Sequence, residues 1–292
     1  MSKHVMENRQ RIIDRIFKAQ GDDGFWKVLA KSDKYYPGYM HYVPNFKASL
    51  WTLILLADLG CKRNEPRIKK PLREIQNHFF DDNHKIFTLK EDHFPIPCLN
   101  GNMIYLDSYF NKTPDKKSLT ALEFFYRFQR FDDGSYNTKT NTYCSNKSCY
   151  GKHSCYWGIV KLLKGISFIP KTFRTKDILY LRDKCIEFIL LHKVCYKSRN
   201  TNIIMIKKMD LLTFPNMYKS DFLEILWLLK REKIKSEKLE PALKLLKSKQ
   251  QESGYWQLER KVNSMVSSIG ELGKPNEFVT DRANEVLKYY YN

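Results

Sequence analysis

A long hydrophobic run is missing from this sequence of 292 residues. A membrane-spanning helix needs about 18 or more consecutive apolar residues, and no stretch approaches that length. The polar residues 1–11 are not followed by the apolar core of a secretory signal either. We therefore expect a cytoplasmic protein without a transmembrane segment.

Acidic residues are too few to balance the basic ones, because 51 Lys and Arg against 32 Asp and Glu give a formal net charge of +19. Such an excess suits an anionic partner, such as a nucleic acid, a phosphorylated substrate or an acidic membrane surface. The lysines are nevertheless scattered, as at Lys69-Lys70 and Lys207-Lys208, and the usual nucleic-acid motifs are absent. The charge is more typical of a lysine-rich composition, and we expect no specific nucleic-acid partner.

Cysteine is present but odd in number, with seven residues in a chain too long to need a disulfide scaffold. Together with the missing export signal, this favours a reducing compartment. We therefore interpret clustered cysteines first as metal ligands or as buried apolar residues.

Three turns share one plan, in which a helix ends in Gln and an acidic turn leads to Gly and, two residues later, an aromatic residue. These turns run from Gln20 to Trp26, from Gln129 to Tyr136 and from Gln250 to Trp256, and residues 79–87 form a degenerate fourth copy. Glycine adopts the left-handed conformation just past a helix end, and the aromatic side chain can then cover the last turn. The pattern therefore predicts repeated helix stops.

Between these turns the periodicity is helical, without a convincing alternating strand pattern. The predicted helices lie at residues 5–19, 46–60, 65–80, 97–109, 116–130, 154–168, 175–192, 218–231, 237–250 and 279–290. Charged amphipathic helices alternate with helices that are apolar on most sides, which predicts an outer layer around a buried inner one. We expect a single all-α domain over residues 1–292, an α/α toroid of about five to six helical hairpins. A gap in so small a ring could be filled by a second copy in a homodimer.

All inner helices of such a ring run in the same direction, so their N-termini meet at one end, which we call the mouth. Helix N-termini carry partial positive charge and unpaired N–H groups, and these favour an anionic ligand. We therefore expect function at the mouth.

The turns that combine Gln, Gly and an aromatic residue resemble the QW repeats of the terpenoid cyclase and protein prenyltransferase superfamily. The chain is most similar to small prokaryotic squalene cyclase-like proteins with prenyltransferase and squalene oxidase repeats. Further segments that carry the resemblance are residues 97–102, 149–158, 191–193, 214–224, 248–250 and 273–275. The resemblance covers nearly the whole chain, and it implies an α/α toroid that acts on isoprenoid-type substrates.

The residues of the three standard isoprenoid chemistries are missing, however. The Asp-Asp pairs at 22–23, 81–82 and 132–133 have neither the earlier Asp of class II cyclases nor the later Asp that would complete a Mg²⁺ site. They are more typical of solvated turns. Asp183 and Cys185 have the spacing of prenyltransferase zinc ligands, but no histidine follows His192.

Four residues near the predicted mouth have side chains that bind thiophilic metals. Cys149, His153 and Cys155 precede one inner helix, and Cys98 lies at the start of the inner helix before it. These helix starts are neighbours in the toroid, so the four side chains could close a tetrahedral zinc site, with Cys144 as a spare ligand. Small residues that pack the helix starts, or thiols with redox chemistry, explain the same pattern.

Other residues of the mouth supply acid–base groups. We expect catalytic roles for His192, at the end of an outer helix, and for Asp221 and Glu224, at the start of an inner one. All three also fit structural roles, because charged groups at helix ends complement the helix dipole. The candidate substrate-binding residues are Tyr218, Lys274 and Trp157.

Three hypotheses of function stay open. The first is a cyclase-like or prenyltransferase-like enzyme that acts on an apolar or phosphorylated small molecule, aided by a metal on the Cys/His group. The second is a noncatalytic toroid that binds a peptide or lipid. The third is a carbohydrate-active α/α barrel in which Asp221 or Glu224 faces Asp107 across the mouth.

Overall fold

The computed structural model describes residues 3–26, 46–89, 94–111, 113–140 and 147–291. This part of the chain is mostly helical, and all ten predicted helices are present in it. Their bounds are α1 (Lys3–Lys18), α2 (Ser49–Asp58), α3 (Pro66–Phe79), α4 (Pro97–Phe110), α5 (Lys116–Phe128), α7 (Tyr156–Phe168), α8 (Lys176–Leu191), α9 (Phe222–Arg231), α10 (Glu240–Ser248) and α11 (Glu277–Tyr291). The prediction of an all-α fold is confirmed.

A few short elements join the helices. They include α6 (Lys147–Tyr150), a hairpin of β1 (Phe80–Asp81) with β2 (Ile86–Phe87), and a hairpin of β3 (Tyr196–Lys197) with β4 (Asn200–Ile204). β1, β2 and β3 have only two residues each, and the five residues of β4 do not alternate in burial, so the sequence does not reveal them. None of the helices described is long and apolar enough to cross a membrane.

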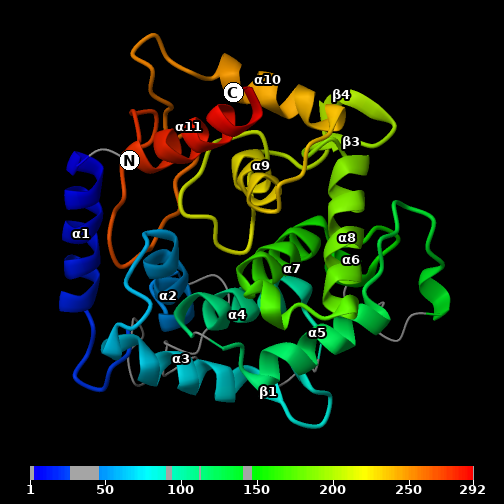
Figure 1. Ribbon diagram of the computed structural model, residues 1–292, viewed down its shortest axis with the longest axis horizontal. Coiled ribbons are helices and arrows are strands. Elements are labelled where there is room, and N and C mark those ends of the chain that lie inside the picture. Colours follow the sequence, from blue (N-terminus) through cyan, green and yellow to red (C-terminus); the bar gives the residue numbers. More distant parts are fainter. Residues whose placement is uncertain (1–2, 27–45, 90–93, 112, 141–146, 292) are drawn as a thin grey trace.

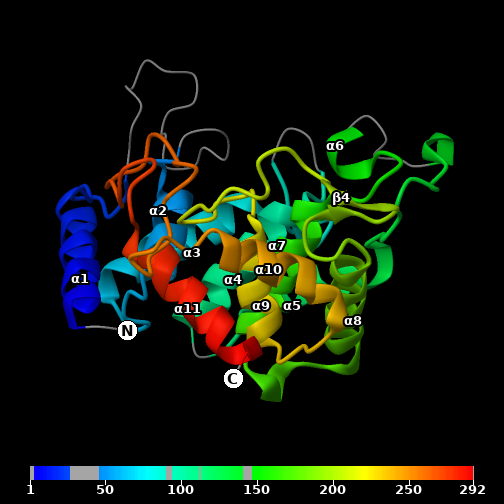
Figure 2. The same cartoon turned by 90° about the horizontal axis from the view of Figure 1, so that it is seen from above.

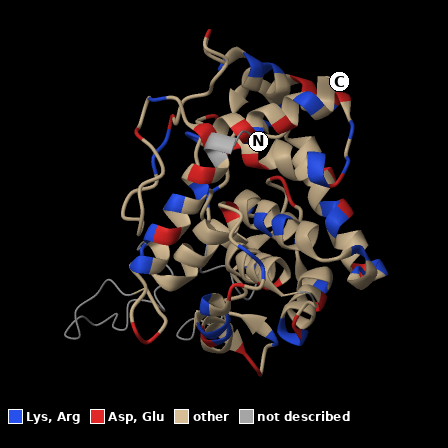
Figure 3. Ribbon diagram, turned by 60° about the vertical axis from the view of Figure 1, so that its left-hand side comes forward, with Lys and Arg blue, Asp and Glu red and all other residues tan. Residues whose placement is uncertain are grey.

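The long helices form two layers (Figure 1). α2, α4, α7 and α9 lie inside, and nearly all their residues are buried. α1, α3, α5, α8 and α10 surround them, and the view from above shows α1 on one flank and α8 on the other (Figure 2). Basic residues are scattered among acidic ones over the outer helices (Figure 3), as expected from a lysine-rich composition rather than from one basic face.

α4 and α7 run in the same direction and touch through glycines. A Cβ atom on Gly158 would lie 2.7 Å from the Cβ of Pro97, at the start of both helices. A Cβ on Gly101 would lie only 2.2 Å from the carbonyl carbon of Lys161, one turn further along. Only glycine permits this approach of the two backbones, which brings the N-termini of α4 and α7 together.

α9 is parallel to α7, and α11 is parallel to α9. Near the N-terminal ends of α7 and α9, the indole Nε1 of Trp157 donates to the carbonyl of Ser220 (3.3 Å), and near their C-terminal ends the Phe168 and Trp227 rings lie 6.0 Å apart. α11 runs in the same direction as α9, because the start of α11 contacts the segment before α9 and the end of α11 contacts the segment after α9. These contacts are Phe278 with Phe214 and Tyr290 with Ile234.

The predicted helix stops are confirmed by the backbone. The three turn glycines have positive φ angles, namely 89° at Gly24, 89° at Gly134 and 80° at Gly254. Trp26 and Trp256 make equivalent contacts with the preceding outer helix. The indole Nε1 of Trp26 donates to the carbonyl of Ile16, and that of Trp256 donates to the carbonyl of Leu246, each at a distance of 2.8 Å. The first and last copies of the turn therefore have the same tertiary structure as well as a similar sequence.

The first and last helices of the chain lie against each other. The guanidinium of Arg9 in α1 is 3.2 Å from the carboxylate of Asp281 in α11, and it also lies over the ring of Phe278. The two ends of the helix series are therefore in contact.

Candidate active site

A cleft of about 840 Å³ opens beside the N-terminus of α7. Its walls come from the turn after α5, the start of α7, the end of α8 and the hairpin of β3 and β4. The lining residues that matter for chemistry are Asp133, Cys155, Trp157, His192, Lys197 and Arg199. These residues come from separate stretches between positions 133 and 199, and the fold brings the stretches together.

His192 follows the last turn of α8 and is only 3% exposed. Its Nδ1 lies 3.2 Å from the carbonyl oxygen of Tyr196, which can only accept, so Nδ1 carries the proton. The other ring nitrogen, Nε2, has no hydrogen-bond partner among the described residues. Burial lowers the pKa of His192 below its ordinary value, more than the carboxylate of Asp133 raises it. His192 is therefore a neutral imidazole with an unused basic nitrogen at the cleft wall.

Asp133 lies near both His192 and His153. Its Oδ1 lies 3.7 Å from Nε2 of His192 and 3.6 Å from Nδ1 of His153, and its Oδ2 accepts the hydroxyl proton of Ser198. Burial raises the pKa of Asp133, but Ser198 and the two histidines outweigh it and bring the pKa below the ordinary value. A carboxylate in this position stabilises positive charge that develops on His192.

Cys155 is the N-cap residue of α7, and its side chain lines the cleft. The thiol of Cys149 donates a hydrogen bond to its sulfur, which lowers the pKa of Cys155 to about 7 against the opposing effect of burial. The backbone N–H groups of Trp157 and Gly158, in the first turn of α7, lower this pKa further. The pKa of Cys155 is thus lowered from its ordinary value, in a cleft that His192 also lines.

The predicted zinc ligands lie in different surroundings. Cys98, Cys149 and Cys155 are close enough to affect one another's ionisation, but His153 is 71% exposed and turned toward Asp133. Over the residues that the structure describes, no three His, Cys, Asp or Glu side chains have an arrangement that could hold a metal ion. Cys144 lies outside these residues, so the Cys3His zinc site stays a prediction.

Asp221 and Glu224 lie deeper than the sequence suggests, because both are fully buried. Asp221 is the N-cap of α9, where one carboxylate oxygen accepts from the N–H of Glu224 (2.8 Å) and the other from the N–H of Thr213 (2.6 Å). Glu224 accepts from the ammonium groups of Lys161 (2.8 Å) and Lys164 (2.9 Å). These contacts favour structural roles for both carboxylates.

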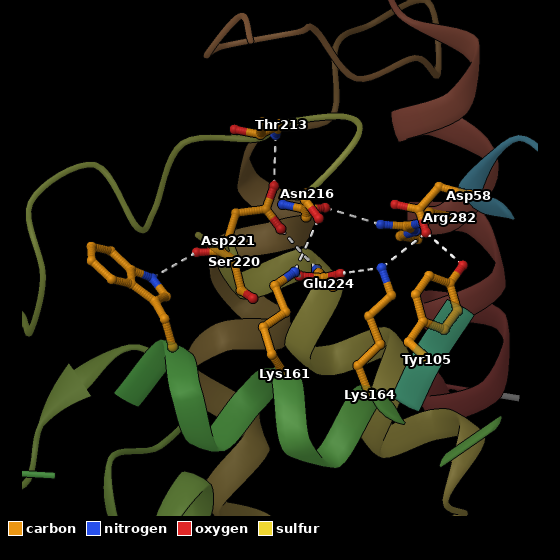
Figure 4. Close-up of polar contacts among 11 residues, drawn as sticks. Asp58, Tyr105, Lys161, Lys164, Thr213, Asn216, Ser220, Asp221, Glu224 and Arg282 are labelled. Carbon is orange, nitrogen blue, oxygen red and sulfur yellow. Dashed lines mark hydrogen bonds and ion pairs between the residues drawn. The ribbon is translucent and has the colours of Figure 1, made fainter. Parts of the chain in front are cut away.

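The ion pairs of Glu224 belong to a network at the centre of the molecule (Figure 4). Lys164 also contacts Asp58 of α2 (2.9 Å), whose carboxylate accepts from the hydroxyl of Tyr105 in α4 (2.8 Å). On the other side, Lys161 donates to the carbonyl of Asn216, whose side chain accepts from Arg282 of α11. Each of α2, α4, α7, α9 and α11 therefore contributes at least one polar side chain to one buried network.

Attraction between the opposite charges of this network keeps its side chains ionised, although burial opposes ionisation. Burial raises the pKa of Glu224, but Lys161 and Lys164 outweigh it and hold the value at about 2. Burial lowers the pKa of Lys161 to about 8, in spite of the nearby Glu224 carboxylate. Burial also acts to lower the pKa of Lys164, yet Asp58 and Glu224 raise it above the ordinary value.

The other predicted residues are distributed around the molecule. Trp157 lines the cleft, whereas the ring of Tyr218 stacks on Phe46 near the start of α2, with centroids 6.2 Å apart. Lys274 is exposed in a turn before α11 and does not line the cleft. Asp107 is buried at the C-terminal end of α4, where it accepts from the backbone N–H of Asp115, so it does not face the N-cap of α9.

Sequence reasoning missed two groups of residues. Asp133 was interpreted as a solvated turn acid, because its importance depends on histidines that only the fold brings near. Lys161 and Lys164 stand in an apolar helix with a spacing of three, so they share a face. Two lysines on an otherwise buried helix are a signal that could have been used, since buried lysines need counter-charges.

Comparison with family models, curated proteins and solved structures found no match to the chain.

Proposed function

We propose that the chain is an α/α toroid enzyme that carries out thiol-dependent acyl transfer or hydrolysis in the cleft at the N-terminus of α7. Three observations support the toroid: the alternation of outer and buried helices, the shared direction of α4, α7, α9 and α11, and the contact of α1 with α11. We also propose that the chain is related to the squalene cyclase-like proteins, that it is cytoplasmic and that it forms a homodimer.

The proposed reaction uses two groups that line the same cleft, Cys155 and His192. Nε2 of His192 takes the thiol proton as Cys155 attacks the carbonyl carbon of an ester or thioester, which forms a carbon–sulfur bond. His192 then returns the proton to the departing oxygen or sulfur as the original bond breaks. A water molecule activated by the same nitrogen afterwards cleaves the thioester and releases the acid. Asp133 stabilises the imidazolium that forms in each half of the reaction.

The walls of the cleft favour a substrate with an apolar body and an anionic group. Lys197 and Arg199 supply positive charge at the hairpin, while Phe188 and Ile206 supply apolar surface. The N-terminus of α7 adds partial positive charge on the same side. An acyl chain linked to a phosphorylated carrier fits this chemistry, and it keeps the apolar, phosphorylated class of small molecule that the sequence predicts.

The observation that carries the proposal is the unused Nε2 of His192. This nitrogen has no hydrogen-bond partner among the described residues, although the Asp133 carboxylate lies 3.7 Å away. A buried ring nitrogen that makes no hydrogen bond is costly, which supports a role for it in the cleft. Its proton-bearing Nδ1 is fixed by Tyr196, which leaves the basic nitrogen available for catalysis.

Octanoyl coenzyme A, which has an apolar acyl chain and phosphate groups, is a suitable probe. The protein is mixed with it at pH 7, and intact-protein and peptide mass spectrometry follow the octanoyl adduct over time. We expect the adduct on Cys155 in the wild-type protein and its absence in Cys155→Ser. Since a general base contributes about 10²–10⁴-fold, His192→Gln should slow acylation at least tenfold.

Cys185→Ala is the matched control, because Cys185 is buried in α8 away from the cleft. This variant should be acylated at the wild-type rate. An adduct spread over several cysteines, or an unchanged rate in a folded His192→Gln variant, would contradict the proposal.

A further inference from the structure

The charges around the cleft differ from those on the outer helices, where basic and acidic residues mix. Residues 147–158 and 188–209 supply all the described residues that line the cleft except Asp133 and Gly134. These two segments contain seven Lys and Arg residues and no Asp or Glu, although the whole chain has 32 acidic residues. We call these seven residues the basic rim, namely Lys147, Lys152, Lys193, Lys197, Arg199, Lys207 and Lys208.

The positive charge of the basic rim is not compensated within the described part of the protein. Its side chains are exposed except that of Lys193, which is half-buried, and none of the seven forms an ion pair with a described residue. On the neighbouring α8, by contrast, the ammonium of Lys184 lies 2.6 Å from the carboxylate of Glu187. The charge of the basic rim is therefore available to an external anionic surface.

Exposed aliphatic side chains accompany these charges. Ile203 in β4 is 42% exposed and Leu191 at the end of α8 is 44% exposed, and both are aliphatic. The apolar surface continues into the cleft with Phe188 and Ile206. An acidic bilayer offers anionic headgroups to the cations and acyl chains to the aliphatic residues. Nucleic-acid bases, in contrast, prefer exposed aromatic rings on which they can stack.

We propose that the basic rim docks the cleft onto an anionic phospholipid bilayer, with Ile203 of the β3–β4 hairpin in the interface. Clusters of about four to eight Lys and Arg beside a membrane are typical of binding to acidic lipids. Docking in this orientation places the cleft against the headgroups, so an acyl chain can pass from the bilayer to the apolar wall. The inference goes beyond the proposed acyl transfer, because it requires neither Cys155 nor His192.

Co-sedimentation with lipid vesicles tests this docking. The probe is a vesicle of phosphatidylcholine and phosphatidylglycerol in equal parts, and a vesicle of phosphatidylcholine alone is the neutral control. We expect the wild-type protein to sediment with the mixed vesicles only, and added salt to release it, because salt screens exposed charges. Cys155→Ser should bind as the wild-type protein does, which separates this result from that of the acylation experiment.

Two double variants distinguish the basic rim from the net charge of the chain. Lys207→Gln with Lys208→Gln removes two cations of the rim, which should weaken binding to the mixed vesicles about tenfold or more. Lys69→Gln with Lys70→Gln removes the same charge from exposed positions of α3, which lies across the molecule from the hairpin (Figure 1). This matched control should bind within about twofold of the wild-type protein. Ile203→Ser should also weaken binding, through loss of the apolar contact.

Circular dichroism first establishes that each variant is folded. Equal losses in the two double variants would show that binding reports only net charge, and this result would overturn the proposal. Wild-type protein that sediments equally with phosphatidylcholine alone would overturn it as well. Tighter binding to a duplex DNA oligonucleotide than to the mixed vesicles would assign the basic rim to a nucleic acid instead.

Discussion

Glu224 illustrates how much one buried side chain can determine. It is fully buried and lies between the ammonium groups of Lys161 and Lys164, which would otherwise be charges without sufficient compensation in the centre of the molecule. Removing one member of a buried ion pair is strongly destabilising, because the remaining charge keeps its desolvation penalty. The carboxylate that the sequence suggested as catalytic is thus placed where it stabilises the fold.

We expect Glu224→Gln to lower the free energy of unfolding at pH 7 by about 3–5 kcal/mol. Urea denaturation followed by circular dichroism measures the change. Glu240→Gln is the matched control, because the Glu240 side chain is 45% exposed and pairs only loosely with Lys244, at 3.6 Å. The control should change stability by less than about 0.5 kcal/mol.

The Glu224 carboxylate also predicts that the free energy of unfolding depends on pH. Its pKa is about 2 in the folded protein against an ordinary value of 4.5, so the unfolded chain binds the proton more tightly. The stability from Glu224 is therefore complete above pH 4.5 and is lost as the pH falls toward 2. The difference in unfolding free energy between wild type and Glu224→Gln should shrink by about 3 kcal/mol over this range. A difference that stays constant with pH would show that the ion pairs contribute little.

At the scale of the element, α4 and α7 depend on glycine for their contact. Gly101 permits the backbone of α4 to touch that of α7 at Lys161, and this contact positions Lys161 and Lys164 toward Asp58 and Glu224. The close approach also brings Cys98 near the start of α7. Helix packing therefore connects the buried network with the cleft.

Gly101→Ala should destabilise the protein by about 3 kcal/mol or more, because the new Cβ meets backbone atoms that cannot move independently. Thermal unfolding measures the effect. Lys69→Ala, at an exposed position of α3, is the control for a substitution within a helix and should change little. A Gly101→Ala variant as stable as this control would show that the two backbones are further apart.

The repeated turns give a second prediction for elements. Trp26→Phe and Trp256→Phe each remove an indole N–H from a buried carbonyl, so each should lower the unfolding free energy by about 1–3 kcal/mol. Since the two contacts are equivalent, the two losses should agree within about 0.5 kcal/mol when measured by urea denaturation. Trp227→Phe is the comparison, because its indole donates to Glu285 at an exposed position.

The helices could be predicted from the sequence because each depends on local features. The periodicity of apolar residues shows the ten long helices, and Gly24 and Gly254 mark helix ends through a backbone conformation that glycine favours. The site could be predicted only in part. Residue type and position predict His192 as a catalytic residue and Cys155 as a metal ligand, whereas the proposed role of Asp133 depends on contacts across the fold. A spacing of cysteines and a histidine cannot show whether the side chains point toward one another.

At the scale of the whole molecule, the inner helices converge on one network while the cleft lies at their N-terminal side. The network is ionised and fully buried, so it fixes the relative positions of α2, α4, α7, α9 and α11 through pairs that tolerate little displacement. The cleft groups come from separate parts of the chain and depend on that fixed arrangement. The activation that we propose for Cys155 accordingly depends on the complete fold.

The most direct measurement is the order in which the cysteines react with limiting iodoacetamide at pH 7, mapped by peptide mass spectrometry in native protein and in urea. We predict that Cys155 reacts first in the native protein, at least tenfold faster than Cys61 or Cys185, and that its advantage falls in native His192→Gln and disappears in urea. A Cys155 that reacts no faster than the buried cysteines, or equally fast in the unfolded chain, would contradict the account.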